Sequence, residues 1–195
     1  NDEYGISFSL IGIGNIHNII GEYNTALDYY ERSLNIKEKI GDKIGKAWAF
    51  HNIGNVHLYY KGDFDKGLDY YVRSLKISEE IGHKSGIGGS LRSIGLVYLD
   101  KGDYDTALDY LERSLAIAEE IGDKRGLGIS LGNIGTVHMD KGDYDKALDY
   151  YGRSLAIREE LGDKRLMGHS LNSIGTVYAE KGDYESAEEY LKKSL

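Results

Sequence analysis

The segment KGDYDTALDY, residues 101–110, decides the fold of this chain because it returns at a fixed interval. Near-copies follow at Gly142 and Gly182, each 40 residues after the preceding glycine, and two more stand upstream at Gly62 and Gly21. Self-similarity at a constant period is the signature of a repeat protein. Five repeats therefore fill the chain and leave no room for a separate domain.

A second marker, the pair Ile-Gly, has the same period. Its glycines lie 40, 41, 40 and 40 residues apart, at Gly14, Gly54, Gly95, Gly135 and Gly175. The two markers together place one extra residue between Gly54 and Gly62, around Tyr59 and Tyr60. We expect a single array over residues 1–195, with repeats at about 1–41, 42–82, 83–122, 123–162 and 163–195, the last ending inside a helix.

Each repeat has the apolar spacing of two helices, here called helix A and helix B. In the third repeat, one helical stripe precedes the break at Gly102 and another follows it, comprising Leu91, Ile94, Gly95 and Tyr98, then Ala107, Leu108, Leu111 and Leu115. Gly102 suits the residue after a helix end, and Asp103 suits the N-cap of the next helix. Asp63, Asp143 and Asp183 occupy the same N-cap position in other repeats. The fold class is therefore all-α, an α-solenoid of helical hairpins.

This pattern resembles the tetratricopeptide repeat over essentially the whole chain. The positions that carry the resemblance in the third repeat are Leu91, Ile94, Gly95, Tyr98, Gly102, Tyr104, Ala107, Leu111 and Ser114. The repeat is about 40 residues long rather than 34 and lacks the usual closing proline, which is similar to the arrays of kinesin light chains and bacterial Rap-type regulators. The resemblance implies a right-handed superhelix whose helices A line a concave groove, and a function in binding proteins or peptides.

Composition argues against several other classes of function. The sequence has no cysteine, which removes thiolate metal sites and cysteine nucleophiles, and its histidines lack metal-ligand spacing. A net charge of -8 with no basic block disfavours nucleic acid. No segment resembles a signal peptide or a membrane span. We expect a cytoplasmic protein that is not an enzyme and has no cofactor, metal, nucleic acid or membrane partner.

Several columns recur in every repeat and indicate architecture. The Ile-Gly glycines, with a small residue at Ala26 and its equivalents, predict close packing of helices A and B. An acid and a base four residues apart on helix B, such as Asp109 and Arg113, predict exposed ion pairs. A ladder of tyrosines beside those acids is expected to pack between neighbouring hairpins; it contains Tyr29, Tyr70, Tyr110, Tyr150 and Tyr190. A column on helix A is expected to lie in the core; its histidines are His17, His57 and His138.

The columns that differ between repeats lie on helix A, away from the shared stripe, and variable positions on a repetitive scaffold are where specificity can reside. They supply our predicted peptide-binding residues: Phe8, Asn15, Trp48, His51, Asn52, Asn55, Tyr59, Arg92, Asp100, Asn133, Met139, Asp140, Asn172 and Glu180. The asparagines either hydrogen-bond an extended peptide backbone or are solvated or bridge helices. The acidic residues either favour a basic or neutral ligand segment or form a solvated edge. Gly132 is expected to leave space for a ligand.

Three functions remain open on the sequence. The first is a non-catalytic scaffold that binds a peptide or partner domain in the helix A groove. The second is a regulatory or sensor segment of a larger signalling, protease or NTPase protein. The third is a structural array that associates with itself end to end, because neither terminal repeat carries a polar capping helix.

Overall fold

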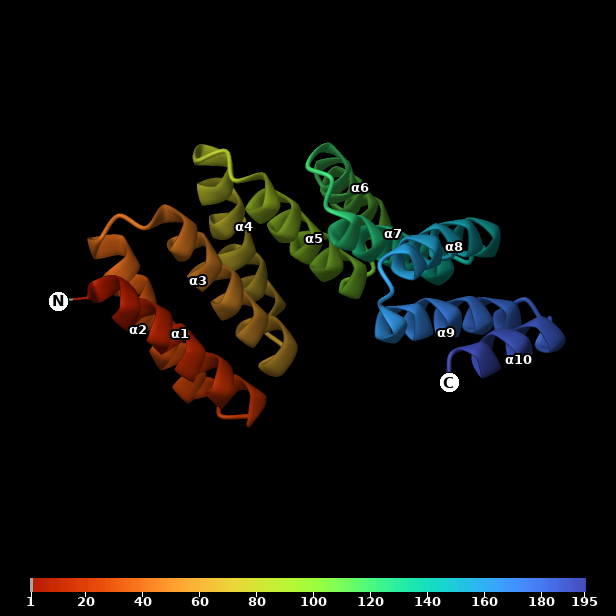
Figure 1. Ribbon diagram of the computed structural model, residues 1–195, viewed down its shortest axis with the longest axis horizontal. Helices are drawn as coiled ribbons and strands as arrows, with labels where there is room; N and C mark the ends of the chain where they lie inside the picture. Colours follow the sequence, from red (N-terminus) through yellow and green to blue (C-terminus); the bar gives the residue numbers. More distant parts are fainter. Residues whose placement is uncertain (1) are drawn as a thin grey trace. The chain divides into compact units, whose positions relative to one another are not determined.

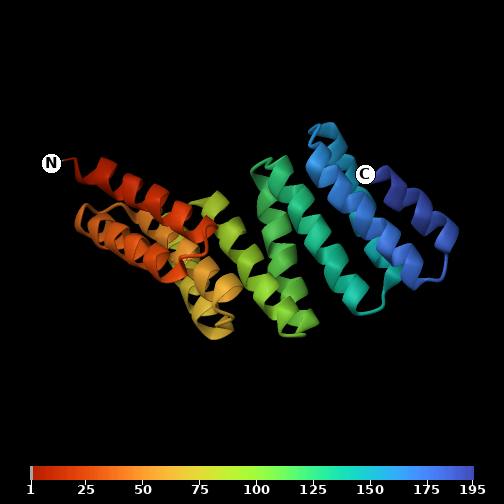
Figure 2. The ribbon, with the colours of Figure 1, turned by 90° about the horizontal axis from the view of Figure 1, so that it is seen from below.

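The computed structural model describes residues 2–195, and in that part of the chain every regular element is a helix (Figure 1). Consecutive helices run antiparallel as hairpins (Figure 2). The elements are α1 (Glu3–Ile19), α2 (Tyr23–Lys39), α3 (Lys43–Asn55), η1 (Val56–Tyr60), α4 (Phe64–Glu80), α5 (Lys84–Asp100), α6 (Tyr104–Glu120), α7 (Lys124–Asp140), α8 (Tyr144–Glu160), α9 (Lys164–Glu180) and α10 (Tyr184–Lys193). Odd-numbered α-helices are helices A, with η1 completing the second, and even-numbered ones are helices B. The predicted all-α hairpin array is confirmed.

The turns use the predicted glycine and aspartate. Gly102 adopts φ 75°, a left-handed conformation that only glycine takes up without strain. The Asp103 carboxylate accepts a hydrogen bond from the Thr106 backbone N–H at 3.2 Å and so caps α6. Asp143 differs, because its carboxylate makes no capping bond and instead lies 3.3 Å from Nδ1 of His138. The prediction that Asp143 caps its helix is therefore wrong: the imidazole at position 138 takes the carboxylate.

The chain forms two compact units, Asn1–Val97 and Tyr98–Leu195. In the first, the buried cluster contains Ala26, Leu27, Tyr30, Ile53 and Val56. In the second, one buried cluster contains Ala147, Tyr151, Ile174 and Val177. Each of these cores joins helix B of one hairpin to helix A of the next.

The Ile-Gly glycine that recurs in every helix A makes room for a large side chain of helix B. A Cβ on Gly54 would lie 2.8 Å from Cε1 of Tyr71, and one on Gly135 would lie 2.8 Å from Cδ1 of Tyr151. Both contacts are shorter than van der Waals packing allows. The predicted role of this column in close packing is confirmed. Its physical cause is the helix B side chain that crosses beneath the helix, a tyrosine ring at Gly54 and Gly135 and Leu191 at Gly175.

The extra residue of the second repeat is absorbed as a π-helical turn, η1, which continues α3. The Lys61 backbone N–H donates to the carbonyl of Val56 at 3.2 Å, an i to i+5 bond. The element spans the position predicted from the spacing, around Tyr59 and Tyr60. Its wider turn restores the register of the following turn at Gly62.

The tyrosine ladder packs within hairpins rather than between them, contrary to the prediction. Tyr29 stacks on His17 at 5.3 Å and Tyr150 stacks on His138 at 5.4 Å, in each case across one hairpin. The guanidinium of the helix B arginine lies over the other face of the ring, as Arg153 does at 5.2 Å from Tyr150. The same arginines form the predicted ion pairs, which are exposed and contribute little to stability.

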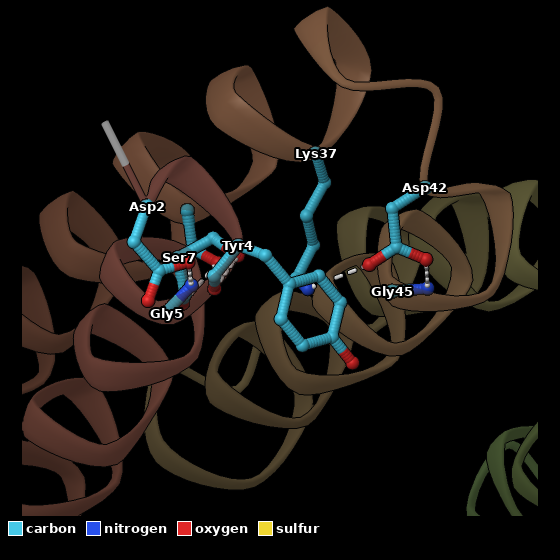
Figure 3. A network of polar contacts seen from close by, with 8 residues as sticks. Asp2, Tyr4, Gly5, Ser7, Lys37, Asp42 and Gly45 are labelled. Carbon is cyan, nitrogen blue, oxygen red and sulfur yellow. Dashed lines mark hydrogen bonds and ion pairs between the residues drawn. The ribbon is translucent and has the colours of Figure 1, made fainter.

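One charged side chain is buried at the first junction (Figure 3). Lys37 is only 4% exposed, and its ammonium lies 3.0 Å from the carboxylate of Asp42 and 5.6 Å from the centre of the Tyr4 ring. Asp42 also accepts the Gly45 backbone N–H at 2.8 Å and so caps α3. Burial opposes ionisation of Asp42, but the hydrogen bonds from Gly45 and Lys37 outweigh it and lower its pKa. Ion pair and cap therefore share one carboxylate.

Candidate partner-binding surface

The richest set of predicted residues forms one stripe along α3 and η1. Trp48, Asn52, Asn55 and Tyr59 lie three or four residues apart, and His51 lies three residues after Trp48 and beside Asn52, so all five share a helical face. The two aromatic ends of the stripe are open to solvent, with Trp48 54% and Tyr59 55% exposed. Large exposed aromatic side chains on a rigid helix are typical anchors of protein recognition.

Tyr71, which is not among the predicted residues, lies beneath this stripe and contacts its side chains. Its hydroxyl donates to Oδ1 of Asn55 at 2.6 Å, and its ring lies 5.2 Å from that of His51. Burial, and then the nearby Tyr59, raise the pKa of Tyr71, so it stays a neutral donor. The Tyr71 side chain passes under helix A at Gly54 and lies next to three predicted residues, His51, Asn55 and Tyr59.

His51 keeps the middle of the stripe uncharged. Burial, reinforced by the nearby guanidinium of Arg92, lowers the pKa of His51 to about 4. At neutral pH its imidazole therefore has one donor and one acceptor nitrogen. Arg92 on α5 supplies the positive charge next to it, so a neutral polar centre adjoins a cation.

The structure decides between the alternatives for two of the asparagines. Asn15 accepts the Tyr30 hydroxyl at 2.7 Å, as Asn55 accepts that of Tyr71, so both bridge helices A and B of their own hairpins. In the fourth repeat Thr136 takes the asparagine's place and accepts from Tyr151 at 3.0 Å. In these three repeats the position is an internal acceptor for the tyrosine hydroxyl. Asn52 lies one helical turn earlier in the stripe and is half-buried.

On α1 the corresponding face is apolar and open. Phe8 is 69% exposed, and Gly12 has no atom within 4 Å of an added Cβ. The face is therefore apolar and carries one exposed aromatic side chain.

In the second unit the predicted residues lie on α7 and α9, apart from Asp100 at the end of α5. Asn133 and Met139 are half-buried, whereas Asn172 and Glu180 are exposed. Partial burial raises the pKa of the Asp100 and Asp140 carboxyl groups.

Gly132 does not leave space for a ligand, and that prediction is wrong. A Cβ there would lie 3.2 Å from Nη2 of Arg158, whose guanidinium occupies the space. Two hydrogen bonds to α9 hold the Arg158 guanidinium in place: it donates to the Leu166 carbonyl at 2.8 Å and to the Ser170 hydroxyl at 2.7 Å. Burial lowers its pKa, although Asp163 opposes this. The residue type at position 158 could have indicated that the space at Gly132 is filled. Arg158 is long, whereas the equivalent positions of two other repeats hold the small residues Ser78 and Ala118.

A surface hollow in the second unit lies away from all these residues. It is at the turn between α7 and α8, lined by residues 142–146 and Lys181. None of the predicted site residues contributes to it.

Stacked helical hairpins with variable side chains on helix A define the class of helical-repeat proteins. The family model of the tetratricopeptide repeat matches residues 6–80, 46–120, 86–160 and 126–195, so the chain belongs to the tetratricopeptide repeat family. Repeats of this family generally mediate protein–protein interaction. None of the helices in the described part of the chain has the length and apolar character that a membrane crossing needs.

Solved structures share the fold at low sequence identity. A Rap protein complexed with competence and sporulation factor matches with a TM-score of 0.84 and 20% identity, over 96% of this chain and 52% of that one. The tetratricopeptide repeat sensor protein of the STAND class from Pyrococcus horikoshii matches with a TM-score of 0.80 and 21% identity, over 99% of this chain and 30% of that one. A kinesin light chain repeat protein from Podosopora anserina matches with a TM-score of 0.76 and 15% identity, over 95% of this chain and 91% of that one.

The resemblance to both kinds of array is confirmed. This chain spans about half the length of the Rap protein. No curated protein matches it.

Proposed function

We propose that this protein is a non-catalytic scaffold that binds an extended segment of a partner protein on the helix A face of its first unit, in the groove that the family resemblance implies. The observation that supports this most is the stripe on α3 and η1, where exposed Trp48 and Tyr59 flank the neutral polar side chains of His51 and Asn52. Aromatic anchors supply the binding energy and the polar centre supplies backbone hydrogen bonds.

The stripe also suggests the chemistry of the ligand. Trp48, with Phe8 on the neighbouring helix A, suits an apolar side chain, and Asn52 can donate to and accept from a peptide backbone. In the second unit, Asp100, Asp140 and Glu180 present carboxylates on the corresponding helices. We propose that they favour a basic or neutral ligand segment, in keeping with the net charge of -8.

A pull-down from the source cell tests this with three baits: wild type, Trp48→Ala and Val72→Ala. Val72 is a matched control, since it is 45% exposed and lies on helix B of the same hairpin. We expect Trp48→Ala to lose partners that wild type and Val72→Ala retain, as identified by mass spectrometry. Equal recovery of the same partner proteins by all three baits would show that this surface does not bind them.

The regulatory alternative is supported by the sensor protein from Pyrococcus horikoshii, in which the matching array is part of a much longer chain. In that case the same helix A face would receive the signal.

A further inference from the structure

The guanidinium of Arg158, near the end of α8, uses only part of its hydrogen-bonding capacity inside the fold. Nη1 makes both of its hydrogen bonds, to the Leu166 carbonyl and the Ser170 hydroxyl of α9. Nε is buried and has no partner among the described residues. Nη2 has no partner there either, but it is in contact with solvent. Because a buried donor without an acceptor is unfavourable, this side chain gains from a further acceptor.

Gly132 lets this guanidinium reach the helix A face of the second unit. A Cβ at position 132 would lie 3.2 Å from Nη2 of Arg158. Position 132 belongs to the same column as His51, which lies in the middle of the stripe on α3. The side chain therefore comes from helix B below, passes α7 at a glycine and is held on the other side by its bonds to α9.

The nearby carboxylate that could neutralise Arg158 is engaged elsewhere. Asp163 caps α9 by accepting a backbone N–H at 3.1 Å, and its second oxygen accepts the Arg125 guanidinium at 3.0 Å. At the first junction the equivalent residues are Lys37 and Asp42, whose charged groups lie 3.0 Å apart. Where the first repeat pairs its cation internally, the fourth repeat leaves the cation without an ion pair among the described residues.

We propose that Arg158 binds a carboxylate of the partner segment on the helix A face of the second unit. This rests on the proposed function, since the carboxylate belongs to the bound segment, and it adds a ligand chemistry that the first unit does not supply. Nε and Nη2 lie on one edge of the planar guanidinium, and a carboxylate binds such an edge through two parallel hydrogen bonds. Nη2, the open member of this edge, meets the ligand first.

The charges on the neighbouring helices limit the ligand to a single carboxylate. Asp140 on α7 and Glu180 on α9 are both exposed. They repel a run of acidic residues, whereas one carboxylate in an otherwise neutral segment can pair with Arg158. The carboxylate is either an acidic side chain or the C-terminus of the segment, and the two sources are separated by experiment.

An NMR titration with small blocked peptides tests the site without a captured partner. The probes are Ac-Ala-Glu-Ala-NH2, whose only carboxylate is a side chain, Ac-Ala-Gln-Ala-OH, whose only carboxylate is terminal, and Ac-Ala-Gln-Ala-NH2, which has none. The Nε–Hε signal of Arg158 is assigned by its loss in Arg158→Lys. The control is the signal of Arg113, which already pairs with Asp109 at 3.4 Å.

We expect the Arg158 signal to shift in a saturable manner with at least one carboxylate peptide, while the Arg113 signal stays in place. The peptide that binds more tightly identifies the source of the carboxylate, and added salt should weaken the binding. If neither carboxylate peptide shifts the Arg158 signal, or if the uncharged peptide shifts it equally, the proposal is wrong.

Partner capture gives a second readout, which separates this proposal from the proposed function. The baits are wild type, Arg158→Gln and the control Arg153→Gln, an exposed arginine of the same helix that pairs with Asp149. Gln at position 158 keeps a donor but loses the charge, so we expect about tenfold lower recovery of the partners that wild type and Arg153→Gln retain. Equal recovery by all three baits would refute the carboxylate contact and leave the scaffold function standing. If Trp48→Ala retains every partner, the surface on the first unit fails, and the titration still decides the role of Arg158.

Discussion

At the scale of single residues, one carboxylate can do the work of two interactions. Asp42 caps α3 and also neutralises the buried ammonium of Lys37. Asp123 caps α7 in the same way, accepting the Gly126 N–H at 2.9 Å, but Ala118 stands where Lys37 would be. The chain thus contains a matched pair of caps, one with and one without a buried charge.

We expect Asp42→Ala to cost about 3 kcal/mol of unfolding free energy, because it removes a cap and leaves a buried ammonium unpaired. Asp123→Ala, the control, should cost only about 1 kcal/mol for the lost cap. Urea unfolding of both variants measures the difference. Equal losses would show that Lys37 does not depend on Asp42.

His51 predicts a pH dependence of stability. Its folded pKa of about 4 lies below the unfolded value of 6.5, so between these values the unfolded state binds more protons. The contribution of neutral His51 is complete above pH 6.5 and is lost as the pH falls toward 4. Wild type should lose on the order of 2 kcal/mol more than His51→Gln between these limits. Parallel pH profiles for His51→Gln and wild type would refute this, and the exposed His169→Gln is the control.

The sequence identified Trp48, His51 and Asn52 because they vary against a fixed background, but it missed Tyr71. The second tyrosine of each Asp-Tyr-Tyr segment looked like ordinary helix B packing. Its hydroxyl reaches the helix A face only because Gly54 lets the ring pass, and this long-range relation is not visible in local spacing. Likewise, Gly132 appeared open because Arg158 lies a full helix away in sequence.

At the scale of elements, the packing of helix A on helix B depends on the missing side chain at Gly54. We expect Gly54→Ala to destabilise the protein by about 2 kcal/mol, because the new methyl group meets Tyr71 and, at 3.2 Å, the Gly67 carbonyl. Gly12→Ala, where nothing lies within 4 Å, should instead stabilise by up to about 1 kcal/mol through helix propensity. Thermal and urea unfolding give both signs, and a stabilising Gly54→Ala would contradict the close packing.

The π-helical turn gives a second prediction for an element. Deleting Tyr59 restores the ordinary 40-residue period, so we expect normal helix content and a change in stability within about 1 kcal/mol. Deleting Asp140, at the corresponding position of regular α7, should destabilise by several times as much, because no extra residue is available to preserve the register. Circular dichroism with urea unfolding compares the two. A collapse of the Tyr59 deletion alone would show that the π turn is required for folding.

The sequence placed the extra residue correctly but could not show its form. Counting between two glycine markers locates an insertion to within a few residues. Whether the insertion becomes a longer turn or a π turn depends on the packing of Val56 and Leu58, which are both buried and hold the helix in register on either side.

At the scale of the whole molecule, the periodic pattern predicted the array because each hairpin contacts only its neighbours. This restriction of contacts to neighbouring hairpins also explains what the periodic pattern could not predict. Cap, ion-pair and stacking partners change from repeat to repeat through single residues, as at Asp143 and His138, while the backbone stays the same. The periodic pattern therefore predicts the backbone of each hairpin but not the side-chain partners that differ between hairpins.

The most direct test uses the fluorescence of Trp48, the only tryptophan in the sequence. A peptide from a captured partner is titrated into the protein while its binding is followed independently by anisotropy of a label on the peptide. We expect a blue shift of the Trp48 emission that saturates together with the anisotropy, because an indole that is 54% exposed becomes buried. Saturating anisotropy with unchanged emission would contradict it, since the peptide would then bind elsewhere.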